Sequence, residues 1–518
     1  MAIGGALGCM SMSYGNTTVC VKSAVVVRSR RVPQWRAQSI AQQKSKSNQT
    51  AQILLSEFRQ ASATPLHRLR QVSDDMTAEM HAGLLSEGGS QQLKMLPTYV
   101  EHLPTGDEEG LFYAVDLGGT NFRVLRVQLG GKEKRIMNQE YQEVAIPPEL
   151  MLGTSKELFD FIAKTLADFV ATEGEGFDAH SGQIRELGFA FSFPVLQTSV
   201  KSGNVIHWTK GFKIDDAVGK DIVAAFEEAI GRKGDHIRVA ALVNDTVGTL
   251  ARGRFWNEDT MLGVILGTGT NACYVERADA VSKWRDPPPK SGEMIINLEW
   301  GNFRSPHLPR TFADEEVDVE SVNPGDQWFE KMVGGMYLGE IVRRVLAKIG
   351  QEAGLFGGSS SPKLFEPFSL STPYVSKMHS DESAELTEVA KILEDVFEIQ
   401  STTFQERKIV HDVCDILAER GARLAAAGIV GILKKIGRDG STTNGSQGPK
   451  NSNGKTVVAM DGGLYEHYAQ FRSYMQAAIE EMLSETAAKS VVLELSKDGS
   501  GIGTALLAAS HSQYGTVF

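Results

Sequence analysis

The stretch from Leu111 to Leu129, LFYAVDLGGTNFRVLRVQL, places polar and glycine residues at a turn between two apolar segments. The residues of interest at this turn are Asp116, Gly118, Gly119, Thr120, Asn121 and Arg123. Glycine lets backbone N–H groups come close to an anion, and a neighbouring hydroxyl adds a donor. A buried carboxylate at the end of the first segment can hold Mg²⁺, usually through water. The stretch therefore predicts a phosphate-binding hairpin, with an ordinary glycine hairpin as the alternative.

The same pattern recurs between Met261 and Arg277, MLGVILGTGTNACYVER. Its turn residues are Gly267, Thr268, Gly269, Thr270 and Asn271. Two anion-binding hairpins about 150 residues apart indicate a duplicated fold that clasps a phosphate chain between its halves. The pattern is neither a P-loop nor a good dinucleotide fingerprint, because no GxxxxGK[ST] follows a strand and each glycine pair opens a hairpin rather than a helix.

The stretch from Ile237 to Arg252, IRVAALVNDTVGTLAR, predicts an apolar strand that runs into a helix start at Asn244-Asp245. An acid at the carboxyl end of a strand is well placed to act on a bound substrate. Asp245 is therefore a candidate general base that takes a proton from an alcohol. The alternative is that Asp245 only caps the helix. Asn244 beside it suits a substrate hydroxyl.

Further polar residues stand at strand ends and in loops. The predicted strand Ile184 to Pro194 leaves Ser192 at its end. The turn-like stretch Val205 to Phe212, VIHWTKGF, carries Thr209, Lys210 and aromatic residues that we expect to be exposed. Such groups are typical of a sugar site, because each hydroxyl of a buried hexose must find a donor or an acceptor.

Two glutamates are weaker candidates. Glu299 lies in IINLEWGNF, and Glu330 lies in QWFEKMVGGMY at the start of a predicted helix. Isolated glutamates are usually solvated surface residues. These two glutamates are candidates for substrate binding only because the other candidate polar residues occur in the same sequence.

Two C-terminal stretches share one form, a strand followed by a glycine turn and a helix. They are Thr456 to Tyr468, TVVAMDGGLYEHY, and Val491 to Ser510, VVLELSKDGSGIGTALLAAS. A glycine-rich turn at a helix start can contact a nucleotide. The alternative for DGSGIG is a flexible surface turn. Residues 437–455, which precede the first stretch, are rich in Gly, Ser and Asn and predict a mobile loop that we expect to be dispensable.

The composition bounds the class of protein. A chain of 518 residues with 42% apolar and 23% charged residues suits a soluble globular protein of two domains. Its net charge of −11 argues against a general nucleic-acid binder. No apolar run approaches the roughly 18–20 residues of a membrane span. The four cysteines have no metal spacing, and we interpret Cys273 as a buried space-filler, with redox sensing as the alternative.

The N-terminus differs in composition from the rest of the chain. Residues 1–56 contain seven Lys and Arg and no acidic residue, which is typical of an organelle transit peptide. We therefore expect residues 1–50 to be a disordered leader that directs the protein to a plastid (the chloroplast stroma), with the mitochondrion as the alternative. A plain disordered tail is a further alternative, whereas Lys22 interrupts the apolar patch that a secretory signal needs.

Helical patterns fill much of the remaining chain. One helix is predicted from about Ala51, and a second follows Thr64-Pro65 and ends at Gly88-Gly89. An amphipathic helix is predicted over residues 155–172, and residues 378–433 also have helical patterns. Together with the strands, these helices predict an α/β fold.

In their order and spacing, the motifs closely resemble those of the hexokinases, and the leader and loop compositions are similar to those of the plant plastid type. The resemblance covers roughly residues 55–510. The matching segments are DLGGTNFR (116–123), FSFP (191–194), WTKGF (208–212), VNDTVGTL (243–250), LGTGTNACY (266–274), MDGGLYEHY (460–468) and DGSGIGTALLAA (498–509).

The resemblance implies the actin-like ATPase fold, a duplicated ribonuclease H-like α/β architecture with two lobes around a central cleft. It implies an N-terminal segment, 51–254, that contains the early helices and the small lobe. A C-terminal segment, 255–512, would form the large lobe, with the last helix returning to the small lobe. The small lobe would span roughly residues 95–247.

The resemblance also implies an ATP-dependent kinase that phosphorylates the 6-hydroxyl of glucose, fructose or mannose. Asp245 would be the general base, and Lys210 would place a positive charge near the reacting oxygen. The implied hexose ligands are Ser192, Thr209, Lys210, Asn244, Asp245, Asn271, Glu299 and Glu330. The implied ATP contacts are Asp116, Gly118, Gly119, Thr120, Asn121, Arg123, Gly267, Thr268, Gly269, Thr270, Gly462, Gly463, Ser500 and Gly501. Mg²⁺ would bind the ATP phosphates, with Asp116 reaching it through water and no direct protein ligand.

Three other functions stay open on the sequence. The chain could be a hexokinase-like glucose sensor that signals without turnover, an actin- or chaperone-like ATPase, or a kinase for a different sugar. The intact catalytic motifs favour an active enzyme, and FSFP and WTKGF have no role in an assembly ATPase. We expect a monomer that binds a hexose and no nucleic acid.

Overall fold

The computed structural model describes residues 34–512 except 175–176, 178–183, 235, 357–360 and 441–453. Most of the predicted leader and of the predicted mobile loop therefore lie outside the described residues. Among the helices of the described ranges, none combines the length and the apolar character that a membrane span requires.

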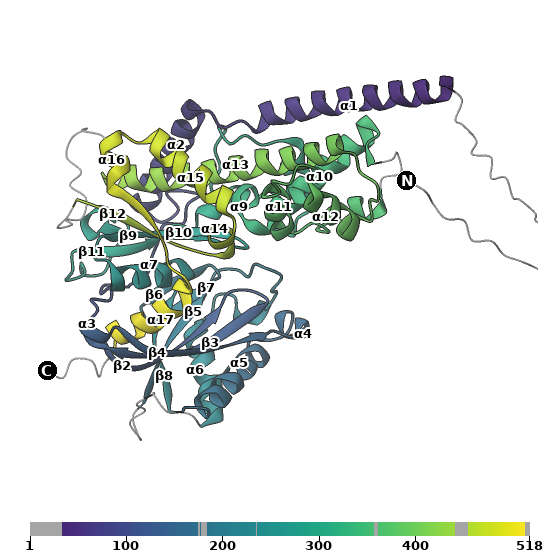
Figure 1. The fold of residues 1–518 in the computed structure, drawn as a ribbon. Coiled ribbons are helices and arrows are strands. Elements are labelled where there is room, and N and C mark those ends of the chain that lie inside the picture. Colours follow the sequence, from purple (N-terminus) through teal and green to yellow (C-terminus); the bar gives the residue numbers. More distant parts are fainter. Residues whose placement is uncertain are drawn as a thin grey trace, which may run out of the picture.

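The smaller of two lobes is built on a five-stranded sheet (Figure 1). Its strands, in spatial order, are β4 (Ile136–Ala145), β3 (Asn121–Gly130), β2 (Glu109–Leu117), β5 (Arg185–Phe191) and β8 (Ile237–Val243). The first three strands along the chain form an antiparallel meander, and β5 and β8 extend the sheet in parallel beside β2. The predicted first hairpin is therefore present, with Asp116 paired to Arg123 across it.

Helices cover both faces of this sheet. Helices α5 (Ser155–Val170) and α6 (Ile222–Lys233) pack on one face in a core rich in phenylalanine. The other face is covered by α17 (Gly499–Ser510), the last helix of the chain, which packs on Ala114 and Leu125. The last helix of the chain thus lies against the small-lobe sheet. Shorter elements of this lobe are α3 (Gly131–Lys134), α4 (Pro148–Met151), β6 (Val195–Ser199) and β7 (Ser202–Val205).

The sheet of the larger lobe repeats the same strand order. Its strands, in spatial order, are β1 (Leu96–Pro97), β11 (Glu293–Asn297), β10 (Thr270–Arg277), β9 (Thr260–Leu266), β12 (Thr456–Asp461) and β13 (Val491–Leu495). Apart from the short β1, an antiparallel meander is again extended by two parallel strands beside its first strand. This repetition confirms the predicted duplication.

Helices from both parts of the chain surround the large-lobe sheet. The central helix α13 (Phe404–Lys435) packs against α2 (Leu66–Leu85) and α15 (Ala469–Met482). The other helices are α1 (Gln34–Ser62), α8 (Phe312–Glu320), α9 (Trp328–Val333), α10 (Gly335–Ala353), α11 (Thr372–His379), α12 (Thr387–Phe397), α14 (Gly463–His467) and α16 (Glu485–Ser490). The early helices thus belong to the large-lobe core, as the resemblance implies.

Helix α7 (Asp245–Trp256) lies between the lobes, where it packs on β9 and on α17 (Figure 1). The contact between α7 and α17 is made backbone to backbone. A Cβ atom added at Gly503 would lie 1.7 Å from the carbonyl oxygen of Gly248. Glycine at these positions therefore allows the two helices to approach closely.

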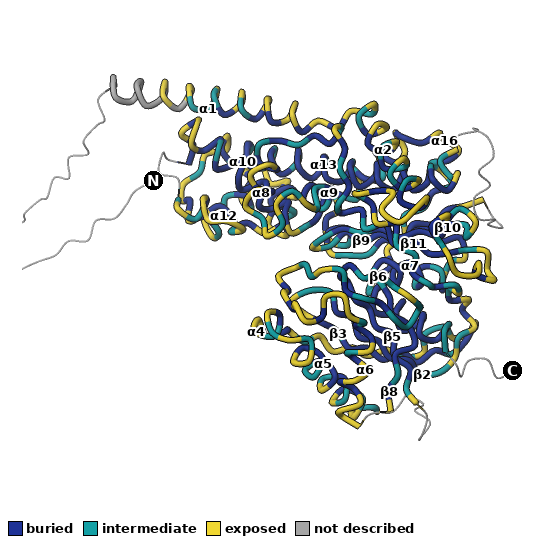
Figure 2. The backbone as a smooth tube through the Cα atoms, turned by 180° about the vertical axis from the view of Figure 1, so that it is seen from behind, coloured by how far each residue is buried: buried dark blue, intermediate teal, exposed yellow. Residues whose placement is uncertain are grey.

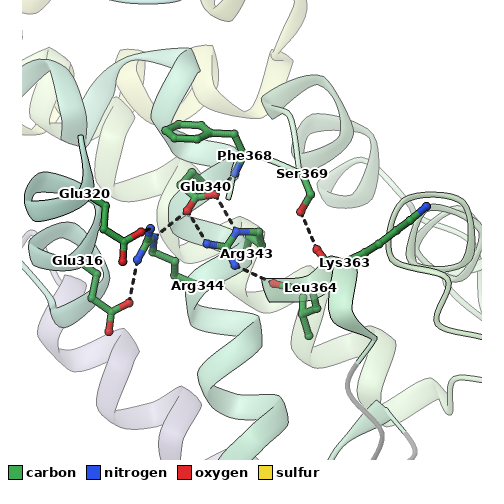
Figure 3. Close-up of polar contacts among 9 residues, drawn as sticks. All are labelled: Glu316, Glu320, Glu340, Arg343, Arg344, Lys363, Leu364, Phe368 and Ser369. Carbon is green, nitrogen blue, oxygen red and sulfur yellow. Dashed lines mark hydrogen bonds and ion pairs between the residues drawn. The ribbon is translucent and has the colours of Figure 1, made fainter. Parts of the chain in front are cut away.

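A buried ionic network on α10 fastens two neighbouring elements to it (Figure 3). Glu340 is fully buried and accepts hydrogen bonds from Arg343 and Arg344 and from the backbone N–H of Phe368 (2.7 Å). Arg344 also contacts Glu320 on α8. The network links α8 and the segment around Phe368 to the helix whose first residue supports the second glycine turn.

Two boundaries differ from the sequence-based expectation. Helix α1 begins at Gln34 rather than near Ala51, so residues 34–50 are helical and not disordered. Where burial is described between residues 42 and 50, the side chains are exposed or half-buried, and Ala51 is fully buried. Figure 2 shows the described part of α1 becoming more buried towards the body of the large lobe. Strand β1 pairs with β11 in the large lobe, so the small lobe begins after residue 97, slightly later than the approximate start at residue 95.

Candidate active site

The first glycine turn lies between β2 and β3, with Asp116 at the end of β2. Asp116 is only 6% exposed, and Arg123 donates to it at 3.1 Å. Arg123 also reaches Asp498, just before α17, at 3.2 Å. Asn121 donates its side-chain amide to Glu143 on β4 (2.5 Å). The turn predicted to bind phosphate is therefore tied through Arg123 to the C-terminal segment predicted to bind the nucleotide.

Lys210 holds the first turn against the end of β5. Its Nζ donates to the carbonyl oxygens of Gly118 and Ser192, both at 2.9 Å. The backbone of Lys210 is in the left-handed region (φ 56°), which residues with a side chain adopt rarely. The charge expected near the reacting oxygen thus lies between two predicted ligand segments, with Thr209 half-buried beside it.

The aromatic residues of this segment are not exposed, contrary to the expectation. Phe212 is buried, and its ring stacks on the ring of Trp208 at 5.6 Å. Both rings also contact Phe193, which is buried. The indole N–H of Trp208 donates to the carbonyl oxygen of Ile214 (2.9 Å). Nζ of Lys210 lies over the Phe193 ring, 5.4 Å from its centre, so the packed rings support the site from below the lysine.

The second glycine turn, between β9 and β10, is held by the start of α10. The backbone N–H groups of Gly335 and Met336 donate to the carbonyl oxygens of Gly267 (2.8 Å) and Thr268 (2.9 Å). A Cβ atom at Gly269 would lie 2.3 Å from a carboxylate oxygen of Glu330, so only glycine leaves room for that side chain. The turn is thereby packed directly against a predicted hexose ligand.

Glu330 and the adenosine segment both contact this second turn. Glu330 accepts a hydrogen bond from the backbone N–H of Thr270 (3.0 Å). Gly462, with φ 103°, lies between β12 and α14, and a Cβ atom there would be 2.4 Å from the carbonyl oxygen of Leu266. Gly463 is the first residue of α14. The predicted strand, glycine turn and helix are confirmed here.

Asp461, which sequence reasoning did not single out, joins the two C-terminal segments. It accepts hydrogen bonds from the N–H groups of Gly462 (2.7 Å) and Ser500 (3.2 Å). Ser500 and Gly501 are buried in the first turn of α17, and Gly501 packs against Leu125. DGSGIG is therefore a buried helix start and not a flexible surface turn.

Asp245 is the first residue of α7, and Asn244 is its N-cap. The side chain of Asn244 accepts from the backbone N–H of Thr246 (3.0 Å). The alternative that Asp245 caps the helix is therefore wrong, and Asp245 is half-buried at the junction of the lobes. Asn244 both caps the helix and lies 3.4 Å from the side-chain nitrogen of Asn271.

Asn271 on β10, Asn297 at the end of β11 and Glu299 just after β11 form a second polar group. Nδ2 of Asn271 donates to Oδ1 of Asn297 at 2.9 Å and lies 3.4 Å from Glu299. Asn297 donates in turn to Glu299 at 2.8 Å. Asn297 was not among the predicted residues, because an asparagine at the end of an apolar strand carries no distinctive signal.

The predicted acids are buried together and influence one another. Burial raises the pKa of Glu299 to about 7, and the negative charge of Asp245 adds to that shift. Burial also raises the pKa of Glu330 and of Asp116, and in both cases the charge of Asp245 adds to the shift. Acids from the first hairpin, from α7 and from the large lobe therefore share one region.

Basic groups oppose these shifts. Lys210 lowers the pKa of Glu299, Glu330 and Asp116. Burial raises the pKa of Asp461 to about 6, and the charge of Arg123 counteracts it. Lys210 belongs to the small lobe and two of its three partners to the large lobe, so the site is built from both.

Neither a metal cluster nor a reactive thiol is found in the described part of the chain. No group of three or more His, Cys, Asp or Glu side chains could hold a metal ion there. Cys273 is fully buried and burial raises its pKa to about 12, which favours a space-filling role over redox sensing. A cavity of about 900 Å³ includes Tyr113, Gln128 and Arg185 in its lining and none of the predicted site residues.

Comparison with known proteins gives one consistent family. Family models described as hexokinase match residues 54–255 and 261–510. A protein of Spinacia oleracea called hexokinase-1 is 57% identical over 514 residues, covering 99% of this chain and 98% of that protein. A protein of Oryza sativa subsp. japonica called hexokinase-2 is 57% identical over 464 residues, covering 90% and 92%. The solved structure of a Schistosoma mansoni hexokinase complexed with glucose aligns with a TM-score of 0.78 at 33% identity, covering 90% of this chain and 99% of that one.

Proposed function

The chain belongs to the hexokinase family and is a hexose-phosphorylating enzyme, and from that premise we propose which residues carry the reaction. Asp245 takes the proton from the 6-hydroxyl of glucose, or of fructose or mannose, as that oxygen attacks the γ-phosphoryl group of ATP. The observation that supports this role is its position. Asp245 begins α7 between the two lobes, and its charge acts on acids from both.

The hexose is proposed to bind among the polar groups around Asp245. Carboxylates accept from sugar hydroxyls, and the side chains of Ser192 and Thr209 can donate or accept. Lys210, fixed by two carbonyl oxygens, holds a positive charge beside this set. The full set is Ser192, Thr209, Lys210, Asn244, Asp245, Asn271, Glu299 and Glu330.

ATP is proposed to lie between the two glycine turns, with its adenosine against residues 462–463 and 500–501. Mg²⁺ bound to its phosphates would be held through water by Asp116 and would offset developing negative charge. The fit rests on a buried carboxylate beside an open glycine turn, because a Cβ atom at Gly119 would meet nothing within 4 Å. Closure of the lobes around both substrates would exclude water and limit ATP hydrolysis.

The test is a turnover assay of the purified protein with ATP, Mg²⁺ and a panel of hexoses. We expect Asp245→Ala to lower kcat by about 10²–10⁴ while glucose still binds. The matched control, Asp168→Ala, removes an exposed aspartate of α5 and should leave turnover unchanged. Near-normal turnover of Asp245→Ala would show that another group is the base.

The compartment and the oligomeric state are further proposals. We infer a plastid enzyme from the basic, acid-free residues 1–56, and a monomer. Imaging a fluorescent fusion of residues 1–50 tests the first point, and mitochondrial signal would replace the plastid assignment. Sedimentation of the purified protein tests the second.

A further inference from the structure

The side chain of Asn297, at the end of β11, is shared between two proposed hexose ligands. Its Oδ1 accepts from the backbone N–H of Glu299 (3.3 Å) and from Nδ2 of Asn271 (2.9 Å). Its Nδ2 donates to a carboxylate oxygen of Glu299 (2.8 Å). Asn297 is only 5% exposed, so these bonds are shielded from water. Both polar atoms of Asn297 are thus engaged by the two ligands.

Backbone groups determine which way these amides point. An N–H group can only donate, so the atom of Asn297 that faces the N–H of Glu299 must be its oxygen. The nitrogen of Asn297 must then face the carboxylate. In the same way, the N–H of Ala272 faces Oδ1 of Asn271 at 2.8 Å, which turns Nδ2 of Asn271 towards Asn297. The order of donors and acceptors is therefore set by the main chain.

The backbone of Glu299 adds a second reason for this arrangement. Its φ of 56° is in the left-handed region, which residues with a side chain adopt rarely. The bond from the N–H of Glu299 to the side chain of Asn297, two residues earlier, is the kind that stabilises such a turn. Asn297 therefore holds both the main chain and the carboxylate of Glu299.

We propose that Asn297 is a positioning residue for hexose phosphorylation, which orients Asn271 and holds the Glu299 carboxylate ready to accept a sugar hydroxyl. The inference rests on the proposed assignment of Glu299 to the hexose. Asn297 itself need not touch the sugar, because its polar atoms are already used. Its removal should weaken hexose binding and leave ATP binding unchanged.

The groups that face Glu299 predict how this role depends on pH. Burial raises the pKa of Glu299 to about 7, and the charges of Asp245 on α7 and Glu330 on α9 add to the shift. The bond from Asn297 lowers that pKa, as does the charge of Lys210. Only the ionised carboxylate is a pure acceptor. Hexose affinity should therefore fall as the pH falls through the pKa of Glu299.

The test compares Asn297→Asp with Asn302→Asp. The first variant keeps an acceptor for Asn271 and replaces the donor to Glu299 with a negative charge. Asn302 lies in the same segment and bonds to the backbones of Gln327 and Gln92. We expect Asn297→Asp to raise the hexose KM about tenfold or more, the scale of losing a hydrogen bond to a charged group. The acid limb of kcat/KM for the hexose should move up by about one pH unit, whereas Asn302→Asp should not move it.

The outcomes separate this inference from the site assignment. If Asn297→Asp lowers kcat/KM equally at every pH, its role is only structural and the proposal is wrong. Should the first variant fail to fold, Asn297→Ser, which removes the amide donor to Glu299 without adding a charge, should move the limb in the same direction. Glu299→Gln should raise the hexose KM and move the acid limb to lower pH, because the carboxyl group with the pKa of about 7 is gone. An unchanged hexose KM in Glu299→Gln would overturn the hexose site itself, while a lowered limb there with an unmoved limb in Asn297→Asp would overturn only the role of Asn297.

Discussion

Replacing Glu340 with glutamine should cost far more stability than its small change in shape suggests. The Glu340 carboxylate is fully buried and accepts from Arg343, Arg344 and the N–H of Phe368 (Figure 3). A glutamine keeps the size, but one accepting oxygen becomes a donating amide. At least one of these donors then faces another donor, and the negative charge between two guanidinium groups is gone.

The size of the expected stability loss follows from the contacts that Arg343 and Arg344 keep in the variant. Arg344 keeps its contacts with Glu316 (3.3 Å) and Glu320 (2.5 Å). Of the contacts drawn in Figure 3, Arg343 keeps only the carbonyl oxygen of Leu364 (2.7 Å). Its guanidinium is then a buried charge that has lost its carboxylate partner. Breaking a buried ion pair by removing one partner costs about 3–5 kcal/mol. We expect the free energy of unfolding to fall by that amount.

The assay is equilibrium unfolding in urea, followed by far-UV circular dichroism, with Glu320→Gln as the matched control. Glu320 contacts the same Arg344, but its side chain is 57% exposed, so its loss should cost about 1 kcal/mol or less. Each variant removes one carboxylate that contacts Arg344. The two carboxylates differ mainly in how deeply they are buried. A Glu340→Gln variant within about 1 kcal/mol of wild type, or an equal cost for both variants, would refute the reasoning.

Two further predictions concern the site and the lobe junction. Burial raises the pKa of Glu299 from 4.5 to about 7, so the folded state loses stability as the pH rises through that range. Glu299→Gln should therefore raise Tm more at about pH 8 than at about pH 5. Equal gains at both pH values would contradict the inference that Glu299 is a buried carboxyl group with a raised pKa. Gly503→Ala should lower Tm severely, because its Cβ would lie 1.7 Å from a backbone oxygen of Gly248. Gly231→Ala in α6, where a Cβ meets nothing within 4 Å, should be neutral or stabilise by up to about 1 kcal/mol, and similar losses for both would argue against the close helix contact.

The parts of the fold that depend on local pattern were predictable from the sequence. Both glycine hairpins have apolar segments on either side of a turn that only a few residue types allow, and both are present as β2–β3 and β9–β10. The start of α7 at Asp245 was also correct, because an apolar strand followed by polar caps is a strong local signal.

The parts that depend on distant contacts were not predictable in this way. Asn297 and Asp461 have the appearance of ordinary strand-end residues, and their partners are set only when several strands assemble. The burial of Trp208 and Phe212 depends on packing against Phe193, on another strand end. Helix α1 extends to Gln34 although residues 34–50 lack an apolar stripe, so hydrophobic periodicity gave no reason to extend it.

The order in which the chain is made gives the last helix a particular importance. Strand β8 ends at Val243, but α17, which covers one face of the sheet, begins at Gly499. At the usual rate of translation, on the order of tens of seconds pass between the synthesis of β8 and that of α17, and that face of the sheet lacks its covering helix during this time. Ala114 and Leu125 are exposed for that time and are natural targets for a chaperone. A premature stop codon near the end of the message would therefore damage the small lobe, whose sheet is completed long before that point.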